Sequence, residues 1–142
     1  MGGTSSKSTA GDYARLARML LNRGSLGDVQ VLKPGSVDLM LANHLPDALL
    51  DQRFPILHYV IGDGNGHGLN GMVCLDPDRA GRPVGKGTYE WGGAFGCWFW
   101  IDPEHDLLCI GMVNRKRIMT DMRPPETVAQ EFVYRALREA RA

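Results

Sequence analysis

Two consecutive glycines, Gly92 and Gly93, stand in the most aromatic part of the chain, where residues 89–101 read YEWGGAFGCWFWI. Glycine weakens a strand unless another backbone or a ligand must come close to it. A pair of glycines at such a place lets a partner approach within hydrogen-bonding distance of the strand. These two residues are therefore the first candidates for a functional site. The structural alternative is a bulge beneath packed tryptophan side chains.

The glycine-rich segment upstream contains two patterns that resemble ligand-binding loops. Gly66, Gly68 and Gly71 match G-x-G-x-x-G, but a dinucleotide site needs a helix to begin there, and the strand-like MVCLDP follows instead. We therefore interpret this segment as a flexible loop. The stretch from Asp63 begins like a calcium loop, yet its twelfth position is Cys74 where such a loop needs a glutamate.

The residues that most often bind metals are not spaced as ligands here. The four histidines have no ligand spacing, and we expect them in loops or on the surface: His44, His58, His67 and His105. The three cysteines form no CxxC or zinc pattern: Cys74, Cys97 and Cys109. The sequence therefore predicts neither a metal site nor a cofactor.

Two short segments only partly match the motifs of serine hydrolases. Thr4 stands three residues before Lys7, where the motif Ser-x-x-Lys needs a serine, and Lys86-Gly87-Thr88 is a scrambled Lys-Thr-Gly in an expected loop. The chain contains no Ser-x-x-Lys, no Tyr-x-Asn and no G-x-S-x-G. We therefore identify no catalytic nucleophile and no catalytic residue in these 142 residues.

The composition favours one globular domain without a nucleic-acid partner. The 142 residues are 44% hydrophobic and 23% charged, as in ordinary globular proteins. Sixteen basic and sixteen acidic side chains cancel, so no basic surface for nucleic acid is indicated. The apolar runs are too short to span a bilayer, and no signal peptide is visible at Met1. We expect a cytoplasmic protein with no membrane span.

The order of the expected elements predicts an α+β fold with an antiparallel sheet flanked by N- and C-terminal helices. Helical patterns cover 10–23 and 124–142, and strands are expected at 72–75, 97–101 and 107–113. The last two strands are apolar on both faces, so both faces must be covered. The final helix shows an apolar stripe that we expect to be buried, with Tyr134 on the solvated face; the stripe comprises Ala129, Phe132, Val133, Ala136, Leu137 and Ala140.

Several segments together resemble one family of enzymes. STAGDYARLARMLLNRG, VLKPGSVDLMLANHLPD, GLNGMVCLDPDRAG and GTYEWGGAFGCWFWIDPEHDLLCIGMVN occur here in this order. The chain resembles the C-terminal part of a serine beta-lactamase-related hydrolase, penicillin-binding-protein-like in fold. It is most similar to the class C beta-lactamase-like esterases, also called family VIII-type esterases. The resemblance covers nearly the whole of residues 1–142, which we interpret as a single C-terminal portion of such a domain.

The resemblance implies a role for the glycines. The third active-site motif of this family is Lys-Thr-Gly or His-Thr-Gly, and the esterase branch often has Trp-Gly-Gly, which Trp91, Gly92 and Gly93 match. It implies that Trp91 lines the acyl pocket and that the N–H of Ala94 serves as one oxyanion donor. Tryptophan in place of a cationic residue removes an anchor for carboxylates and favours neutral esters.

The resemblance also implies that the nucleophilic serine, its lysine and the tyrosine of the second motif lie outside this chain. One hypothesis is therefore a fragment of a serine hydrolase, inactive alone, that acts on a small ester or lactam when completed by an N-terminal half. The alternative is a non-catalytic binding or vestigial protein from a truncated or split gene. Apolar strands left uncovered by the missing half would favour self-association.

Overall fold

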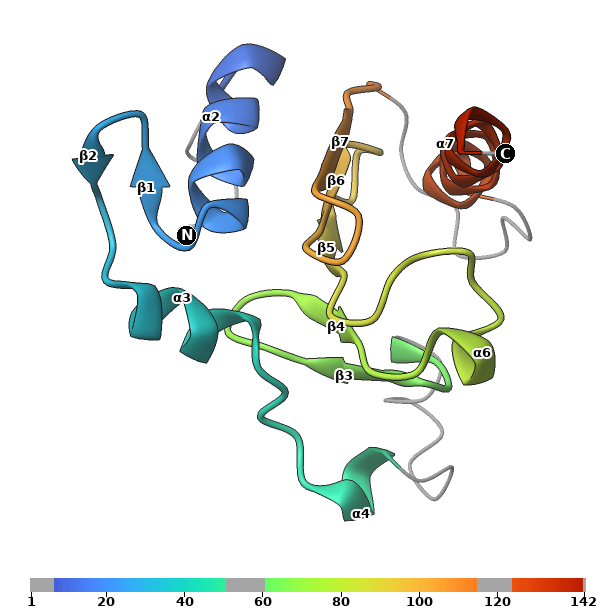
Figure 1. The fold of residues 1–142 in the computed structure, drawn as a ribbon. Helices are drawn as coiled ribbons and strands as arrows, with labels where there is room; N and C mark the ends of the chain where they lie inside the picture. Colours follow the sequence, from blue (N-terminus) through green and yellow to red (C-terminus); the bar gives the residue numbers. More distant parts are fainter. Residues whose placement is uncertain (1–6, 51–60, 115–123, 142) are drawn as a thin grey trace.

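The computed structural model describes residues 7–50, 61–114 and 124–141 (Figure 1). The described strands form a two-stranded hairpin and an antiparallel five-stranded sheet in the order β3-β4-β5-β6-β7. The expected α+β class is confirmed. The larger sheet consists of β3 (Asn65–His67), β4 (Met72–Cys74), β5 (Tyr89–Gly92), β6 (Trp98–Asp102) and β7 (Leu107–Gly111). The other elements are α2 (Ala10–Leu21), β1 (Ser25–Leu26), β2 (Val29–Gln30), α3 (Pro34–Leu41), α4 (Asp47–Leu50), α6 (Pro77–Ala80) and α7 (Pro125–Ala140).

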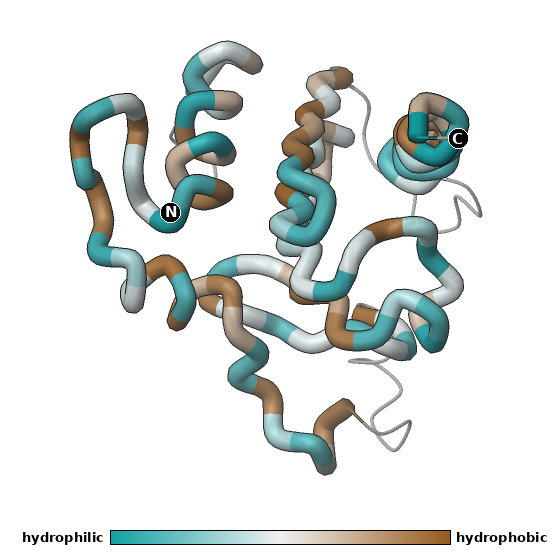
Figure 2. The backbone as a smooth tube through the Cα atoms, in the orientation of Figure 1, coloured by the Kyte–Doolittle hydropathy of each residue, from teal (hydrophilic) through white to brown (hydrophobic). Residues whose placement is uncertain are grey.

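Helices α2 and α7 lie on opposite sides of strands β5, β6 and β7 (Figure 1). On one face Ala17 and Leu20 of α2 belong to the same buried cluster as Phe99 and Ile101 of β6. On the other face Tyr134 of α7 shares a second buried cluster with Trp100, which lies between those two residues in β6. Trp100 is almost fully buried. Both faces of β6 are therefore covered, as its continuous apolar sequence requires. Hydrophobic residues recur along these strands (Figure 2).

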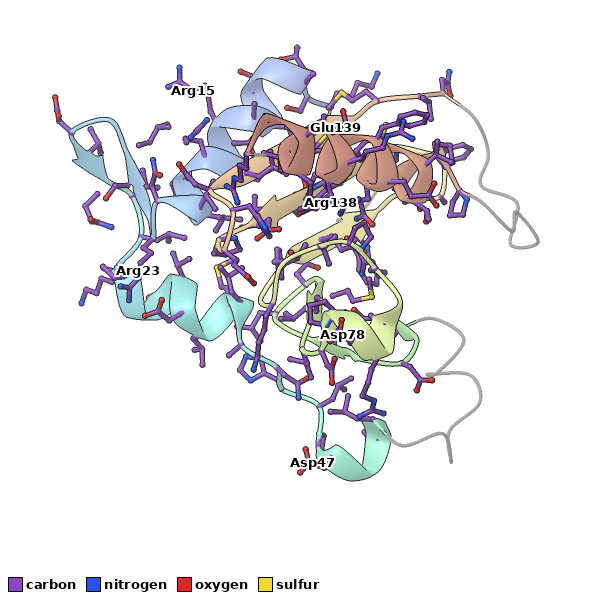
Figure 3. The ribbon with its side chains drawn as sticks, turned by 45° about the vertical axis from the view of Figure 1, so that its right-hand side comes forward. Arg15, Arg23, Asp47, Asp78, Arg138 and Glu139 are labelled. Atoms are coloured by element: carbon purple, nitrogen blue, oxygen red, sulfur yellow. The ribbon has the colours of Figure 1, made fainter. Side chains whose placement is uncertain are left out.

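Local sequence signals explain where the helices begin. The side chain of Thr9 accepts a hydrogen bond from the backbone N–H of Asp12, which caps α2, and Pro34 occupies the first turn of α3. Charged side chains lie outside these contacts: Arg15 of α2 and Glu139 of α7, both labelled in Figure 3, are exposed. No described helix has the length and apolar character that a bilayer span demands.

The sequence prediction for the last helix was wrong in part. Phe132 is 57% exposed, whereas Tyr134, expected on the solvated face, is 2% exposed. Ala136 and Ala140 are also exposed. Gln130 and Tyr134 take the buried positions because each makes hydrogen bonds to the sheet, to Glu90 and Asp102 respectively. The buried face of α7 therefore includes two polar side chains that a search for hydrophobic residues at helical spacing does not find.

The glycine-rich segment is more ordered than a flexible loop. Asn65, Gly66 and His67 form β3, which pairs with β4 in register from Asn65↔Cys74 to His67↔Met72. The intervening turn places Asn70 at φ 70°, a left-handed conformation that asparagine tolerates. Strand β4 and not a helix follows Gly71, as the strand-like MVCLDP sequence predicted. The β1–β2 hairpin, with Gly27 at φ 59°, was also not predicted.

Candidate functional site

The Trp-Gly-Gly motif lies at the end of β5, where the strand has a neighbour on one side only. β4 pairs with β5 at Glu90 and Tyr89, and this pairing goes no further. β6 continues to pair along the other edge, opposite Trp91 and Gly92. Within the part of the chain that the structure describes, the outer backbone edge of Trp91 and Gly92 therefore has no strand partner. Such an edge offers backbone hydrogen-bonding groups to an approaching molecule.

A tight turn follows the motif and joins β5 to β6. The N–H of Gly93 donates to the carbonyl oxygen of Cys97 at 2.7 Å, and the N–H of Gly96 donates to the carbonyl oxygen of Gly93 at 3.0 Å. Gly96 has φ 89°, which explains why glycine is needed there. Gly93 therefore lies just beyond the strand, and Ala94 is exposed in the turn.

Gly93 differs from the glycines that the packing of this chain requires. A Cβ added at Gly111 would lie 2.0 Å from Trp98, and one added at Gly71 would lie 2.4 Å from Tyr89. At Gly93 the nearest atom would be the Cys97 carbonyl oxygen at 3.6 Å, an ordinary van der Waals distance. The contacts within this chain thus account for glycine at 111 and 71 but leave room for a larger residue at 93.

The side chain of Trp91 is 44% exposed and contacts one other aromatic ring. The imidazole of His67 meets the indole with ring centroids 5.4 Å apart and an interplanar angle of 83°. Phe95, at the tip of the turn, is 64% exposed. Sequence reasoning had assigned His67 to a loop or surface role, and the 24-residue gap to Trp91 carries no motif that would have joined them.

The face of β5 opposite Trp91 is fixed by a polar network. The guanidinium of Arg82 forms an ion pair with the carboxylate of Glu90, with both side chains largely buried. The amide of Gln130 in α7 donates to the same carboxylate at 2.9 Å and accepts from Arg82 at 3.2 Å. Because Glu90 directly precedes Trp91, this network holds the motif strand against α7.

A second network lies at the far end of β6, around the fully buried carboxylate of Asp102. It accepts hydrogen bonds from the Tyr134 hydroxyl at 2.5 Å, from the Gly85 N–H at 2.8 Å and from His105 Nδ1 at 2.9 Å. Burial alone would raise the pKa of Asp102, but these hydrogen bonds together with the His105 charge lower it. Burial and the Asp102 carboxylate raise the pKa of Tyr134, which keeps the phenol protonated.

The segments that resembled other motifs have structural roles. Lys86 and Gly87 form a turn in which the N–H of Lys86 donates to Glu104 at 2.7 Å. The hydroxyl of Thr88 is buried and donates to the Gly85 carbonyl oxygen at 2.7 Å. The segment from Thr4 to Lys7, which partly matches Ser-x-x-Lys, lies mostly outside the described residues.

No group of three potential metal ligands gathers among the described residues. Burial raises the pKa of the Cys74 and Cys109 thiols.

Sequence comparison places the chain beside longer proteins. Protein Rv1367c of Mycobacterium tuberculosis is 41% identical over 111 residues, which are 75% of this chain and 27% of that protein. The uncharacterized protein MT1414 of another strain of the same species matches equally. The chain therefore spans about a quarter of the length of these curated relatives.

Solved structures share the fold. "EstCE1, a hydrolase with promiscuous acyltransferase activity" superposes with a TM-score of 0.71 at 25% identity, covering 89% of this chain and 30% of that one. Simvastatin synthase (LovD) from Aspergillus terreus superposes with a TM-score of 0.70 at 22% identity, covering 93% of this chain and 35% of that one. Both comparisons match only a part of the larger fold.

A family model for beta-lactamase matches residues 2–133, which is most of the chain. The matched region includes every strand of the five-stranded sheet and the Trp-Gly-Gly motif at its end. The family match and the shared mixed fold of helices and antiparallel sheet agree with the resemblance seen in the sequence. This chain belongs to the beta-lactamase family and corresponds to one part of the fold of its larger members.

Proposed function

We propose that this chain is the C-terminal portion of a serine hydrolase domain and forms one wall of its active site. The substrate class is a small neutral ester, with lactams as the less favoured class. The reaction proceeds through an acyl-enzyme on a serine that a segment outside these 142 residues supplies. The chain by itself is inactive, because an oxyanion donor without a nucleophile has no intermediate to stabilise.

The observation that carries this proposal is the combination of an open strand edge with an unexplained glycine. The outer edge of Trp91 and Gly92 lacks a strand partner among the described residues, and contacts within the chain do not require glycine at 93. Both features fit a place where a second backbone and a substrate come close. The N–H of Ala94, a residue exposed in the turn, would polarise the ester carbonyl there, and Trp91 would line the acyl pocket.

The wall is built on rigid elements, as an active site requires. Hydrogen bonds of Glu90 to Arg82 and Gln130 fix the strand immediately before Trp91. The bond between the Gly93 N–H and the Cys97 carbonyl oxygen fixes the turn immediately after it. Ala94 is thus held between two anchored positions, so that its N–H is oriented before a substrate binds.

The test uses the protein extended upstream of Met1 in its reading frame, with p-nitrophenyl butyrate as the ester. Gly93→Val places a branched side chain where the substrate would come close to the strand. It should keep the ester carbonyl away from the Ala94 N–H and lower kcat/KM at least about 100-fold, the cost of a lost oxyanion donor. The thermal melting temperature of the 142-residue chain with Gly93→Val should stay unchanged, because an added Cβ at Gly93 meets only an ordinary van der Waals contact within this chain. Gly35→Val is the control, since an added Cβ at Gly35 meets nothing within 4 Å. Unchanged turnover in Gly93→Val would contradict the proposal.

A non-catalytic binding module is the second candidate, favoured by the exposure of Trp91 and Phe95 at the motif. The upstream reading frame separates the two. An in-frame Ser-x-x-Lys and Tyr-x-Asn support the hydrolase, whereas their absence from the extended frame supports the binding module.

A further inference from the structure

The contact between His67 and Trp91 joins residues from two hairpins at the proposed substrate wall. The two rings meet almost at right angles, at 83°, with centroids 5.4 Å apart. This edge-to-face arrangement is the favoured geometry for aromatic pairs. Because Trp91 is still 44% exposed, one part of the indole is supported by His67 and another part is open to a ligand.

Hydrogen bonds to the backbone of His67 hold this residue in place. Its N–H donates to Asn43 Oδ1 at 3.0 Å, and its carbonyl oxygen accepts from the N–H of His44 at 2.8 Å. The side chain of Asn43 is itself fixed, because it exchanges hydrogen bonds with both the N–H and the carbonyl oxygen of Leu45. The segment before α4 therefore clamps β3 at the residue that contacts Trp91.

The imidazole ring is fixed as well. His67 Nδ1 lies 2.7 Å from the carbonyl oxygen of Gly68, so Nδ1 carries the hydrogen and donates. Gly68 is held in place, because its N–H donates to the Gly71 carbonyl oxygen at 2.8 Å and the N–H of the next residue donates to the Met40 carbonyl oxygen at 2.9 Å. The next residue is tied down by the hydroxyl of Tyr89, which donates to the Leu69 carbonyl oxygen at 2.7 Å. The ring that supports Trp91 thus has little freedom of its own.

From this geometry we propose that His67 is a positioning residue for Trp91, and that the two rings form an aromatic corner selecting esters with a flat aryl group. Two perpendicular ring surfaces allow a planar group to stack on one ring while its edge meets the other. A puckered ring of equal size can do neither well. This inference rests on the proposed function, since it names the substrate class of the same wall.

Binding to the 142-residue chain tests the corner without any need for turnover. The probe is phenyl butyrate, compared with cyclohexyl butyrate, which has the same length but a puckered ring. The readout is the indole N–H resonance of Trp91 in a proton–nitrogen correlation spectrum, assigned by its loss in Trp91→Phe. We expect phenyl butyrate to shift this resonance and to bind about fivefold more tightly than cyclohexyl butyrate.

Three histidine variants separate positioning from folding. His67→Ala should weaken phenyl butyrate about fivefold and leave cyclohexyl butyrate unchanged, whereas His67→Phe should restore the affinity to within about twofold. His44→Ala is the matched control and should bind as the wild-type chain does, because its ring contacts the Leu39 carbonyl oxygen and not Trp91. Melting temperatures are measured for each variant.

Each other outcome has a definite meaning. Equal affinity of His67→Ala and wild type for phenyl butyrate overturns the role of His67 and leaves the proposed wall intact. Loss of folding in both His67 variants also overturns it, because His67 would then be structural. If phenyl butyrate fails to shift Trp91 in the wild-type chain, the aromatic corner is overturned, whereas the wall itself stands or falls with the turnover of Gly93→Val in the extended protein.

Discussion

The hydroxyl of Tyr134 donates a hydrogen bond of 2.5 Å to the carboxylate of Asp102, and both side chains are buried. This bond connects α7 to the end of β6, which is the central strand between the two helices. The same carboxylate accepts from the Gly85 N–H at 2.8 Å and so also ties down the loop that leads into β5. One buried acid thus links the last helix to the loop before the motif strand.

Removal of the Tyr134 hydroxyl should destabilise the fold. Tyr134→Phe keeps the ring in its cluster but deprives a buried carboxylate of one donor, at a cost of about 1–3 kcal/mol in the free energy of unfolding. Urea denaturation followed by tryptophan fluorescence measures this change. Tyr13→Phe is the control, since Tyr13 uses its ring, which packs edge-on against Phe99 at 5.1 Å. Equal stabilities of both variants would show that the bond contributes nothing.

Acid should weaken this same network. The pKa of Asp102 is lower in the folded chain than its ordinary value of about 3.9, so the unfolded chain binds the proton more readily. The stabilisation is therefore present above about pH 4 and is lost as the pH falls through the lower, folded pKa. In Asp102→Asn the free energy of unfolding should fall less steeply below pH 4. A parallel acid dependence in the two proteins would contradict this assignment.

Gly111 at the end of β7 and Gly93 in the turn between β5 and β6 should respond differently to the same substitution. Gly111→Ala places a Cβ 2.0 Å from Trp98, which stacks on Trp100, and should cost about 1–3 kcal/mol through overpacking. Gly93→Ala meets only ordinary contacts and should change the free energy of unfolding by no more than about 0.5 kcal/mol. Thermal melts of the 142-residue chain compare the two. A large loss at Gly93 would mean that this glycine serves the fold.

The isolated chain should associate with itself. β7 is the last strand of the sheet, so its outer edge has no strand partner among the described residues, and its five residues are only half-buried. Phe95 and Met112 add exposed apolar surface beyond the strands. Sedimentation velocity should show oligomers that grow with concentration, and Phe95→Ser should reduce them. A monodisperse monomer with a sharp, high melting transition would instead identify a stand-alone domain.

The sequence predicted helices α2 and α7 and strands β6 and β7 because their signals are local. The side chain of Thr9 caps α2, and the continuous apolar strand around Trp100 is covered on both faces. The burial of Tyr134 was missed because it depends on Asp102, 32 residues away in the sequence. The spacing of hydrophobic residues cannot predict that a polar side chain is buried through a hydrogen bond to a residue far away in the sequence.

The residue types pointed to Gly92 and Gly93, and the family resemblance added Trp91, but neither predicted the surroundings of the motif. The contact with His67 arises only after β3 and β5 have both paired with β4, which lies between them in the sheet. The glycine-rich segment was interpreted as a loop because the strand-like MVCLDP follows it in place of the helix that a dinucleotide site needs. Its glycines instead allow close packing, as at Gly66, where a Cβ would lie 2.4 Å from Asn43.

The central claim is that this chain supplies a wall of the active site while the nucleophile lies elsewhere. The most direct test treats the 142-residue chain and the upstream-extended protein with a fluorophosphonate probe and follows p-nitrophenyl butyrate turnover. We predict no labelled serine and no turnover for the chain alone. The extended protein should show one labelled serine, within a Ser-x-x-Lys, and ester turnover. Labelling of a serine within these 142 residues, accompanied by turnover, would contradict the account.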